Sequence, residues 1–303
     1  MTSGRPDGSP SLTAETAGGS PSLRRGRWLR PARQPEVLRS RPGHTGAPWP
    51  LAVPAVIAIL FLVLPLVGLL IRAPWKELPT LLSDPTVREA LRLSLVTATL
   101  ATGVSLVIGV PLAWVLARVR FPGRSLLRAL VILPLVLPPV VAGLALLLAF
   151  SRSGPLGTAL QPFGVRVPLT AAAVVLAQCF VAGPFYVYAV AAGLSGVDTS
   201  VEEVARTLRA SPWYVFRTVT LPLIRPALAY GLVLSGARAL GEFGATITVA
   251  GNLQGRTQTM PTAIYIAFER DPDGAVALAV ILAVVSFVLL LAVRGLRLAR
   301  AAV

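Results

Sequence analysis

Six apolar stretches, each close to the length that crosses a membrane, constrain this chain more than any other feature. They cover approximately residues 51–71, 93–116, 126–150, 168–194, 227–250 and 275–293. A helix needs about 20 residues to cross a hydrocarbon core of about 30 Å. The 303 residues are 54% hydrophobic and 14% charged, with a mean hydropathy of +0.73, which is typical of an integral membrane protein. The sequence therefore predicts an all-α membrane protein with six transmembrane helices.

Residues 1–48 have a different composition, rich in Gly, Pro, Ser and Arg and without apolar periodicity. Such a composition predicts a disordered tail, followed by a transmembrane domain over 49–303. Nineteen of the 28 Lys and Arg residues fall in this tail, in the connections after the second and fourth stretches, and at the C-terminal end. Because short cytoplasmic loops carry an excess of Lys and Arg, both termini are predicted to be cytoplasmic.

Several function classes are disfavoured by what the chain contains. The net charge of +15 comes mostly from Arg in the tail and in short loops, not from a patch with interleaved aromatics, so no nucleic acid is expected as a partner. The single Cys179 and the single His44 make a Cys/His metal site or catalytic pair improbable. The only lysine, Lys76, lies outside any phosphate-binding P-loop pattern. We therefore expect no catalysis and no cofactor bound by this chain.

The loop over 197–226 is the most polar interruption of the second half and is predicted to hold two short helices. Ser200 and Glu203 have the spacing of a capping box, so a helix is predicted to begin at Ser200. Its apolar stripe has the spacing i, i+3, i+4 and i+7 and consists of Val201, Val204, Ala205 and Leu208. On another face, Glu202 and Arg206 are predicted to form an i, i+4 pair.

A second helix in this loop is predicted to begin at Ser211-Pro212, with Ser as the N-cap and Pro at the first helical position. Pro222 and Pro226 are predicted to end or kink the chain beyond this helix.

The loop resembles the cytoplasmic signature loop of ABC importer permeases, which is written E-A-A-x3-G-x9-I-x-L-P. The matching residues are Glu203-Val204-Ala205, then Arg209 after three residues, then Val219-Thr220-Leu221-Pro222 after nine. Val204 replaces the second Ala, and Arg209 replaces the Gly. The resemblance implies a type I ABC importer permease-like bundle whose loop helix docks on a separate ATPase subunit, which binds ATP and Mg. The implied ATPase-coupling residues are Ser200, Val201, Glu203, Val204, Ala205, Leu208 and Arg209. The alternative is an amphipathic helix that lies on the membrane surface.

Proline residues interrupt the third stretch. Pro134, Pro138 and Pro139 are predicted to break the helix near its start. A broken helix in a membrane usually borders a cavity, and a structural kink alone is the alternative. Three segments are similar to molybdate-type permeases: Leu133–Gly143, Ser153–Gly157 after this stretch, and Gly241–Thr248 in the fifth stretch. This resemblance implies a permease homodimer in the lipid bilayer of a bacterial plasma membrane, an extracytoplasmic oxyanion-binding protein, and molybdate as cargo. Sulfate or thiosulfate remains the alternative cargo, and a secondary transporter is a further alternative, although no internal repeat is evident.

The fifth stretch holds the charged pair Arg238 and Glu242. On a continuous helix, these residues would share one face with Gly231, Ser235 and Thr246. We expect the two ions to neutralise each other or to bond to carbonyls of the broken third helix, because an unpaired ion in a membrane is costly. Gly241 and Gly244 are expected to allow close helix approach. Two roles remain open, a gate that changes partners during transport and a structural contact. The predicted pathway or gate residues are Pro138, Pro139, Ser235, Arg238, Gly241, Glu242, Gly244 and Thr246.

Overall fold

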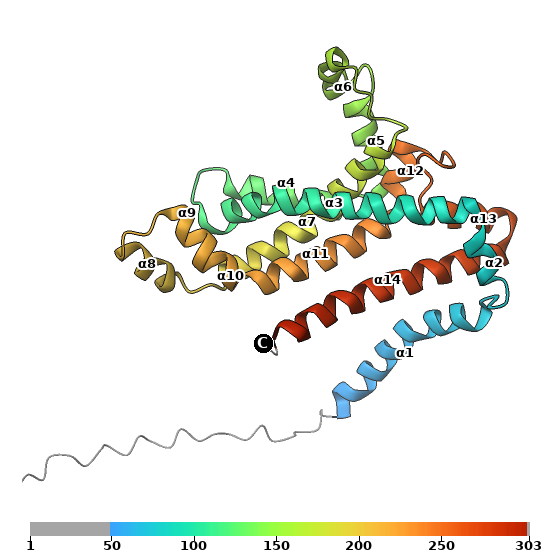
Figure 1. Cartoon of the computed structure of the whole chain (residues 1–303), viewed down its shortest axis with the longest axis horizontal. Helices are drawn as coiled ribbons and strands as arrows, with labels where there is room; N and C mark the ends of the chain where they lie inside the picture. The colour runs from blue at the N-terminus through green and yellow to red at the C-terminus, as the bar shows by residue number, and fades with distance from the viewer. Residues whose placement is uncertain (1–48, 302–303) are drawn as a thin grey trace, which may run out of the picture. The chain divides into compact units, whose positions relative to one another are not determined.

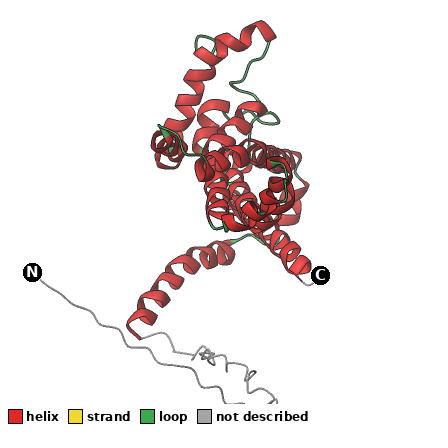
Figure 2. Cartoon of the chain, turned by 90° about the vertical axis from the view of Figure 1, so that its left-hand side faces the viewer, coloured by secondary structure: helices red, strands yellow, loops and turns green. Residues whose placement is uncertain are grey.

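The computed structural model describes residues 49–301, and within that range every element is a helix or a loop (Figure 2). The predicted tail over residues 1–48 lies outside the described residues. The chain divides into two compact units, one ending at Ala58 and one formed by Ile59–Val303. The first described element, α1 (Trp49–Arg72), begins in the first unit, and all later elements belong to the second.

Four helices in the described range are long and apolar enough to cross a membrane, and six spans result if each of two bent pairs is counted as one span. The four are α1, α3 (Pro85–Arg118), α7 (Ala171–Ser195) and α14 (Pro272–Ala301). The first bent pair is α4 (Arg124–Val136) with α5 (Pro139–Phe150), at 115°, and the second joins the segment Pro212–Leu223 to α11 (Arg225–Leu240), at 68°. The prediction of an all-α membrane protein is confirmed. The predicted number of six spans is reached when both bent pairs are counted as spans.

The third predicted span is broken where two of its three prolines lie. Helix α4 ends at Val136, and Pro139 is the first residue of α5, where its missing N–H costs no helical hydrogen bond. Pro134, in contrast, lies inside α4. The predicted break of the helix is therefore confirmed at Pro138-Pro139. The prediction that Pro134 also breaks the helix is wrong.

The fifth predicted span is not one helix, which corrects the sequence-based expectation. Helix α11 ends at Leu240, and the short helix α12 (Gly244–Ala250) begins after the three residues Gly241–Phe243. The Glu242 carboxylate accepts a hydrogen bond from the Ala245 N–H at 2.8 Å and so satisfies a donor that the first turn of α12 leaves free. A continuous stripe from Gly231 to Thr246 therefore does not exist.

The centre of the second unit is formed by α3, α7 and α11, which lie side by side (Figure 1). Small side chains bring these helices close together, among them Ala98 and Ala101 of α3, Ala182 of α7 and Ala239 of α11. The ring of Tyr186 on α7 is fully buried next to glycines of both neighbouring helices. A Cβ atom at Gly109 would lie 2.6 Å from its Cδ1 atom, and one at Gly231 would lie 3.0 Å from its Cδ2 atom. Close backbone approach is the usual basis of helix association in membranes.

Shorter elements connect these helices. They are α2 (Leu78–Ser83), α6 (Pro155–Leu160), the 3-10 turn η1 (Gln161–Phe163), α8 (Thr199–Thr207), α9 (Pro212–Val215), the π-helical turn η2 (Phe216–Thr220), α10 (Leu221–Leu223) and α13 (Met260–Arg270). Helices α8 to α10 make up the polar loop that the sequence singles out.

Candidate functional site

Helix α8 begins one residue earlier than predicted and has a different cap. Thr199 is its first residue, and the Asp198 carboxylate accepts a hydrogen bond from the Ser200 N–H at 2.9 Å. The predicted capping box of Ser200 and Glu203 is therefore wrong, because Asp is an equally good N-cap and lies two residues upstream. The bond from Ser200 also lowers the pKa of the Asp198 carboxyl below its usual value. A carboxylate at this position stabilises the N-terminus of the helix.

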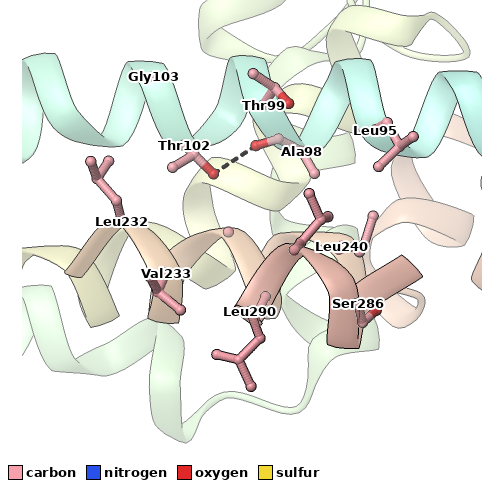
Figure 3. A pocket seen from close by; sticks show the side chains of 13 residues that line it. Leu95, Ala98, Thr99, Thr102, Gly103, Leu232, Val233, Leu240, Ser286 and Leu290 are labelled. Carbon is pink, nitrogen blue, oxygen red and sulfur yellow. Dashed lines mark hydrogen bonds between the residues drawn. The ribbon is translucent and has the colours of Figure 1, made fainter. Parts of the chain in front are cut away.

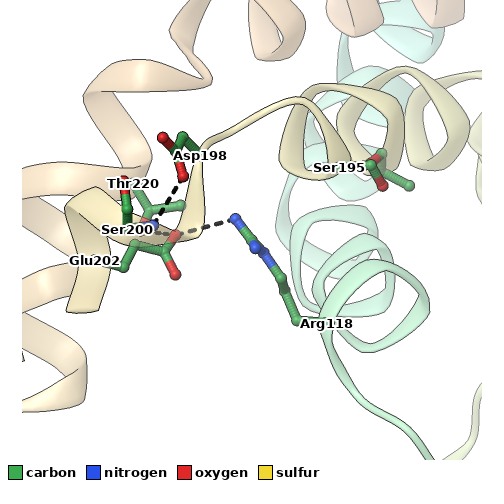
Figure 4. A network of polar contacts seen from close by, with 7 residues as sticks. Arg118, Ser195, Asp198, Ser200, Glu202 and Thr220 are labelled. Carbon is green, nitrogen blue, oxygen red and sulfur yellow. Dashed lines mark hydrogen bonds and ion pairs between the residues drawn. The ribbon is translucent and has the colours of Figure 1, made fainter.

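Glu202 fastens α8 to the membrane helices (Figure 4). Its Oε1 atom accepts from Arg118 Nη2 at 3.1 Å and from Thr220 Oγ1 at 2.9 Å. Arg118 is the last residue of α3, and Thr220 ends η2, so one carboxylate joins three elements. Glu202 is 4% exposed. The predicted pair with Arg206 is wrong, because burial next to Arg118 and Thr220 directs the Glu202 carboxylate inward.

The predicted apolar stripe of α8 lies on its outer side. Val201 and Val204 are 47% and 61% exposed, and Ala205 is half-buried. Leu208, which is predicted to continue the stripe, lies one residue past the end of α8 and is 79% exposed. Glu203 is exposed as well. Glu202 therefore holds one side of α8 to the bundle, and the apolar face of α8 is uncovered in this single chain.

Arg209 follows α8 with a φ of +60°, in the left-handed region. An L-residue with a side chain is strained in this region, whereas Gly adopts it freely. Arg209 stands at the Gly position of the permease signature, so the backbone there has the shape that this Gly would favour. The Arg209 side chain is exposed.

The second loop helix begins as predicted. The Ser211 hydroxyl accepts from the Tyr214 N–H at 3.3 Å, and Pro212 is the first residue of α9. The segment continues through η2 and α10, so Pro222 lies within a helix. The chain then bends by 68° at Ile224, between the two prolines that are predicted to end or kink it.

The Arg238–Glu242 pair is present, and it bridges two helices rather than lying on one. Arg238 Nη1 is 2.6 Å from Glu242 Oε2, while the other oxygen of Glu242 holds the first turn of α12. The Glu242 side chain is 1% exposed and that of Arg238 is 29% exposed. Of the two outcomes expected for this pair, mutual neutralisation is the one observed. Ser235 and Thr246 are fully buried, and their hydroxyls have no hydrogen-bond partner within the described residues.

The two broken spans meet at glycines. A Cβ atom at Gly244 would lie 2.8 Å from Pro139 Cβ, and one at Gly143 would lie 2.7 Å from the Ala245 carbonyl oxygen. Helix α12 therefore packs directly on the start of α5. At Gly241 a Cβ atom would meet only the Ala237 carbonyl, at 3.7 Å. The expected close approach is present at Gly244 and absent at Gly241, and Gly143 has the role expected of Gly241.

An apolar cavity of about 430 Å³ lies among α3, α11 and α14 (Figure 3). Its lining includes Thr102, whose hydroxyl donates to the Ala98 carbonyl, together with Val233, Gly236 and Leu290, and no charged side chain. A cavity without cations or free N–H donors is poorly suited to a dianion. Within residues 49–301, no group of three His, Cys, Asp or Glu side chains could hold a metal ion.

Sequence reasoning missed the contacts of Glu202 with Arg118 and Thr220. The available signal was limited to the position of Arg118 at the end of an apolar stretch and of Glu202 beside the signature Glu203. The bonded partners are 84 and 18 residues apart, so no local pattern reports them.

The all-helical bundle and its polar loop have the fold of a type I ABC importer permease. A crystal structure of a bacterial ABC transporter involved in the import of the acidic polysaccharide alginate is similar, with a TM-score of 0.65 and 22% identity over 82% of this chain and 93% of that one. Residues 109–299 match the family described as binding-protein-dependent transport system inner membrane component. The chain belongs to this family.

Two curated relatives are similar over most of their length. The molybdenum transport system permease protein ModB of Mycobacterium tuberculosis is 46% identical over 241 residues, which cover 80% of this chain and 91% of the relative. The sulfate transport system permease protein CysW of Escherichia coli is 38% identical over 235 residues, covering 77% and 80%. The chain is thus a multi-pass inner-membrane permease.

Proposed function

We propose that this chain is the permease subunit of an ABC importer for molybdate. Two copies form the translocation pathway, two ATPase subunits bind ATP and Mg²⁺ on the cytoplasmic side, and an oxyanion-binding protein delivers the cargo from outside. Both chain termini lie in the cytoplasm. This orientation is supported by the excess of arginine in the connections after α3 and after α7.

The observation that carries the ATPase assignment is the uncovered apolar face of α8. Val204 is 61% exposed on α8, and Leu208, which directly follows the last residue of α8, is 79% exposed, while the opposite side of this helix is held to the bundle by Glu202. An amphipathic helix that is fixed on one side and apolar on the other is suited to a groove on a second protein. The position of this face on the loop with the permease signature supports the ATPase as its partner.

Molybdate is the proposed cargo because the ModB relative, which is named for molybdenum transport, is 46% identical, whereas CysW, which is named for sulfate transport, is 38% identical. Sulfate is the second candidate, since CysW covers a similar share of this chain. Both ions are tetrahedral dianions, and the charge that a pathway must accommodate is the same.

Copurification with the ATPase subunit tests the docking of α8. Leu208→Asp places a charge on the apolar face, where docking would bury it without a partner. We expect the variant to lose copurification and cargo transport while the permease stays folded in the membrane. Thr207→Asp adds the same charge to an exposed position outside the stripe and should keep both. Normal copurification and transport by Leu208→Asp would refute the docking.

A further inference from the structure

A polar cavity of about 510 Å³ lies where the end of α3, the connection to α4 and helix α8 meet. Its lining consists of Trp114, Ala117, Arg118, Arg120, Arg124, Thr199, Glu202, Glu203 and Arg206. The four lining residues on α8 have the spacing i, i+3, i+4 and i+7, so they form one face of that helix. The exposed Val201 and Val204 lie on the opposite face. The cavity is therefore separate from the surface that is proposed to contact the ATPase.

The wall of this cavity has an excess of positive charge. Four arginines and two glutamates line it, and Glu202 already pairs with Arg118 (Figure 4). With that pair set aside, three guanidinium groups remain against the single carboxylate of Glu203. Arg120 and Arg206 are exposed, and neither forms a hydrogen bond or an ion pair within residues 49–301. The wall therefore attracts an anion.

The connection between α3 and α4 is held in a defined shape by other arginines. Arg124 donates to the Leu116 carbonyl from Nε at 3.1 Å and from Nη2 at 2.6 Å, and Arg128 Nη2 donates to the same carbonyl at 3.2 Å. These bonds satisfy a backbone acceptor that the C-terminus of α3 leaves free. Gly123, with a φ of +90°, allows the turn into α4. Arg120 is thus carried by a fixed turn, and its guanidinium group stays available to a ligand.

The cavity lies at the depth where two membrane helices end. Arg118 is the last residue of the span α3, and Arg124 is the first residue of α4, which is half of a bent span. Trp114 lines the cavity one turn before the end of α3, and its indole N–H has no hydrogen-bond partner within residues 49–301. Tryptophan is enriched at the level of the lipid headgroups, where its ring meets apolar groups and its N–H meets polar ones. The donors of the cavity therefore lie at the level of the lipid phosphates.

An apolar face of α3 begins at the cavity. The helical period places Pro111, Val107 and Leu100 on the face of α3 that carries Arg118 and Trp114. Val107 and Leu100 are 72% and 54% exposed, and Pro111 is exposed as well. A phospholipid matches both features, with its phosphate in the cavity and its acyl chains along α3. A free oxyanion would use the cavity alone.

We propose that this cavity binds the headgroup of an anionic phospholipid from the leaflet on the α8 side. The phosphate oxygens accept hydrogen bonds from Arg120 and from the indole N–H of Trp114, and bonds between ions of opposite charge are the stronger kind. Basic cavities between transmembrane helices are suited to such headgroups. The excess of positive charge selects phosphatidylglycerol, which has a net negative charge, over phosphatidylcholine, which has none.

The test titrates short-chain phosphatidylglycerol into the complete complex in neutral detergent and counts the lipids bound per permease chain by mass spectrometry of the intact complex. We expect the wild type to bind phosphatidylglycerol and not phosphatidylcholine of the same chain length. Arg120→Gln should weaken binding about fivefold, the contribution of one basic residue at an anionic lipid surface, and Arg120→Glu should weaken it further. Arg217→Gln removes an exposed charge of η2 outside the cavity and should bind like the wild type. Copurification of the ATPase checks that each variant is assembled.

Equal binding of the two lipids, or wild-type binding in both Arg120 variants, would overturn the proposal. It would also be overturned if glycerol phosphate, which has a phosphate but no acyl chains, displaced the lipid at equal concentration, because a free anion would then be the ligand. If phosphatidylglycerol bound only after the ATPase subunits were removed, acidic side chains of the ATPase would be the occupant, and the proposal would be wrong. None of these outcomes depends on which cargo the complex transports.

Discussion

Glu202→Gln is the substitution whose effect can be worked out most directly from the contacts of the loop. Gln has nearly the same shape as Glu and can still accept from Thr220, so the variant removes mainly the charge that faces Arg118. The two charged atoms are 3.1 Å apart. Their gross attraction is about 5 kcal/mol at an effective dielectric constant of ~20, and about 1 kcal/mol in bulk water.

The net loss of stabilising free energy in Glu202→Gln depends on how far water reaches the pair of Arg118 and Glu202. The side chains of Arg118 and Glu202 are 16% and 6% exposed, so water screens the pair only in part. Breaking a fully buried pair costs about 3–5 kcal/mol, and an exposed one is worth at most about 1 kcal/mol. We expect a loss of about 2 kcal/mol, which is about a 30-fold rise in the population of α8 released from α3.

Hydrogen exchange and transport together measure this effect. Amides of residues 199–207 should exchange about 30-fold faster in the variant, and the cargo moved per ATP hydrolysed should fall. Arg206→Gln removes a charge from the same helix without touching Glu202 and should leave both quantities unchanged. The exchanged pair Arg118→Glu with Glu202→Arg should restore part of the loss. Wild-type exchange and coupling in Glu202→Gln, or equal changes in Arg206→Gln, would show that the Glu202–Arg118 ion pair does not hold α8 in place.

Two further substitutions test the backbone at Arg209 and the buried ion pair. Arg209→Gly should relieve the strain of the left-handed backbone and stabilise the loop by about 1 kcal/mol, which would slow hydrogen exchange in α8. Arg209→Ala keeps this strain and should not slow exchange. Equal exchange in the two variants would show that the positive φ is not the cause. Glu242→Gln leaves Arg238 without its counter-ion and should lower transport tenfold or more, while the double change with Arg238→Gln should lower it less. Transport at the wild-type rate by Glu242→Gln, at matched expression, would reduce the pair to an incidental contact.

The membrane fold could be predicted because span length and hydropathy are local properties of the sequence. The break at Gly241–Phe243 could not be predicted, because apolar residues on both sides of it make 227–250 a single apolar stretch in the sequence. Helix α11 ends where the Glu242 carboxylate accepts a hydrogen bond from the Ala245 N–H and pairs with Arg238. The sequence pattern did place these two ions together, because they are four positions apart in the chain.

The loop shows the same division between local and distant causes. An apolar stripe on α8 and a capped start of α9 can be predicted from spacing alone. The choice between Asp198 and Ser200 as N-cap cannot, because both residues cap well and the outcome depends on how the preceding chain leaves α7. The pairing of Glu202 with Arg118 joins residues 84 positions apart, which only the packed structure brings together.

Uptake of labelled molybdate by vesicles that carry the complete complex tests whether this chain is a molybdate permease driven by ATP. We expect accumulation that requires ATP on the ATPase side and cargo-loaded binding protein on the opposite side. Tungstate should compete with this accumulation more effectively than sulfate. Accumulation of sulfate in preference to molybdate would contradict the cargo, and uptake that proceeds without ATP would contradict the assignment as an ABC importer permease.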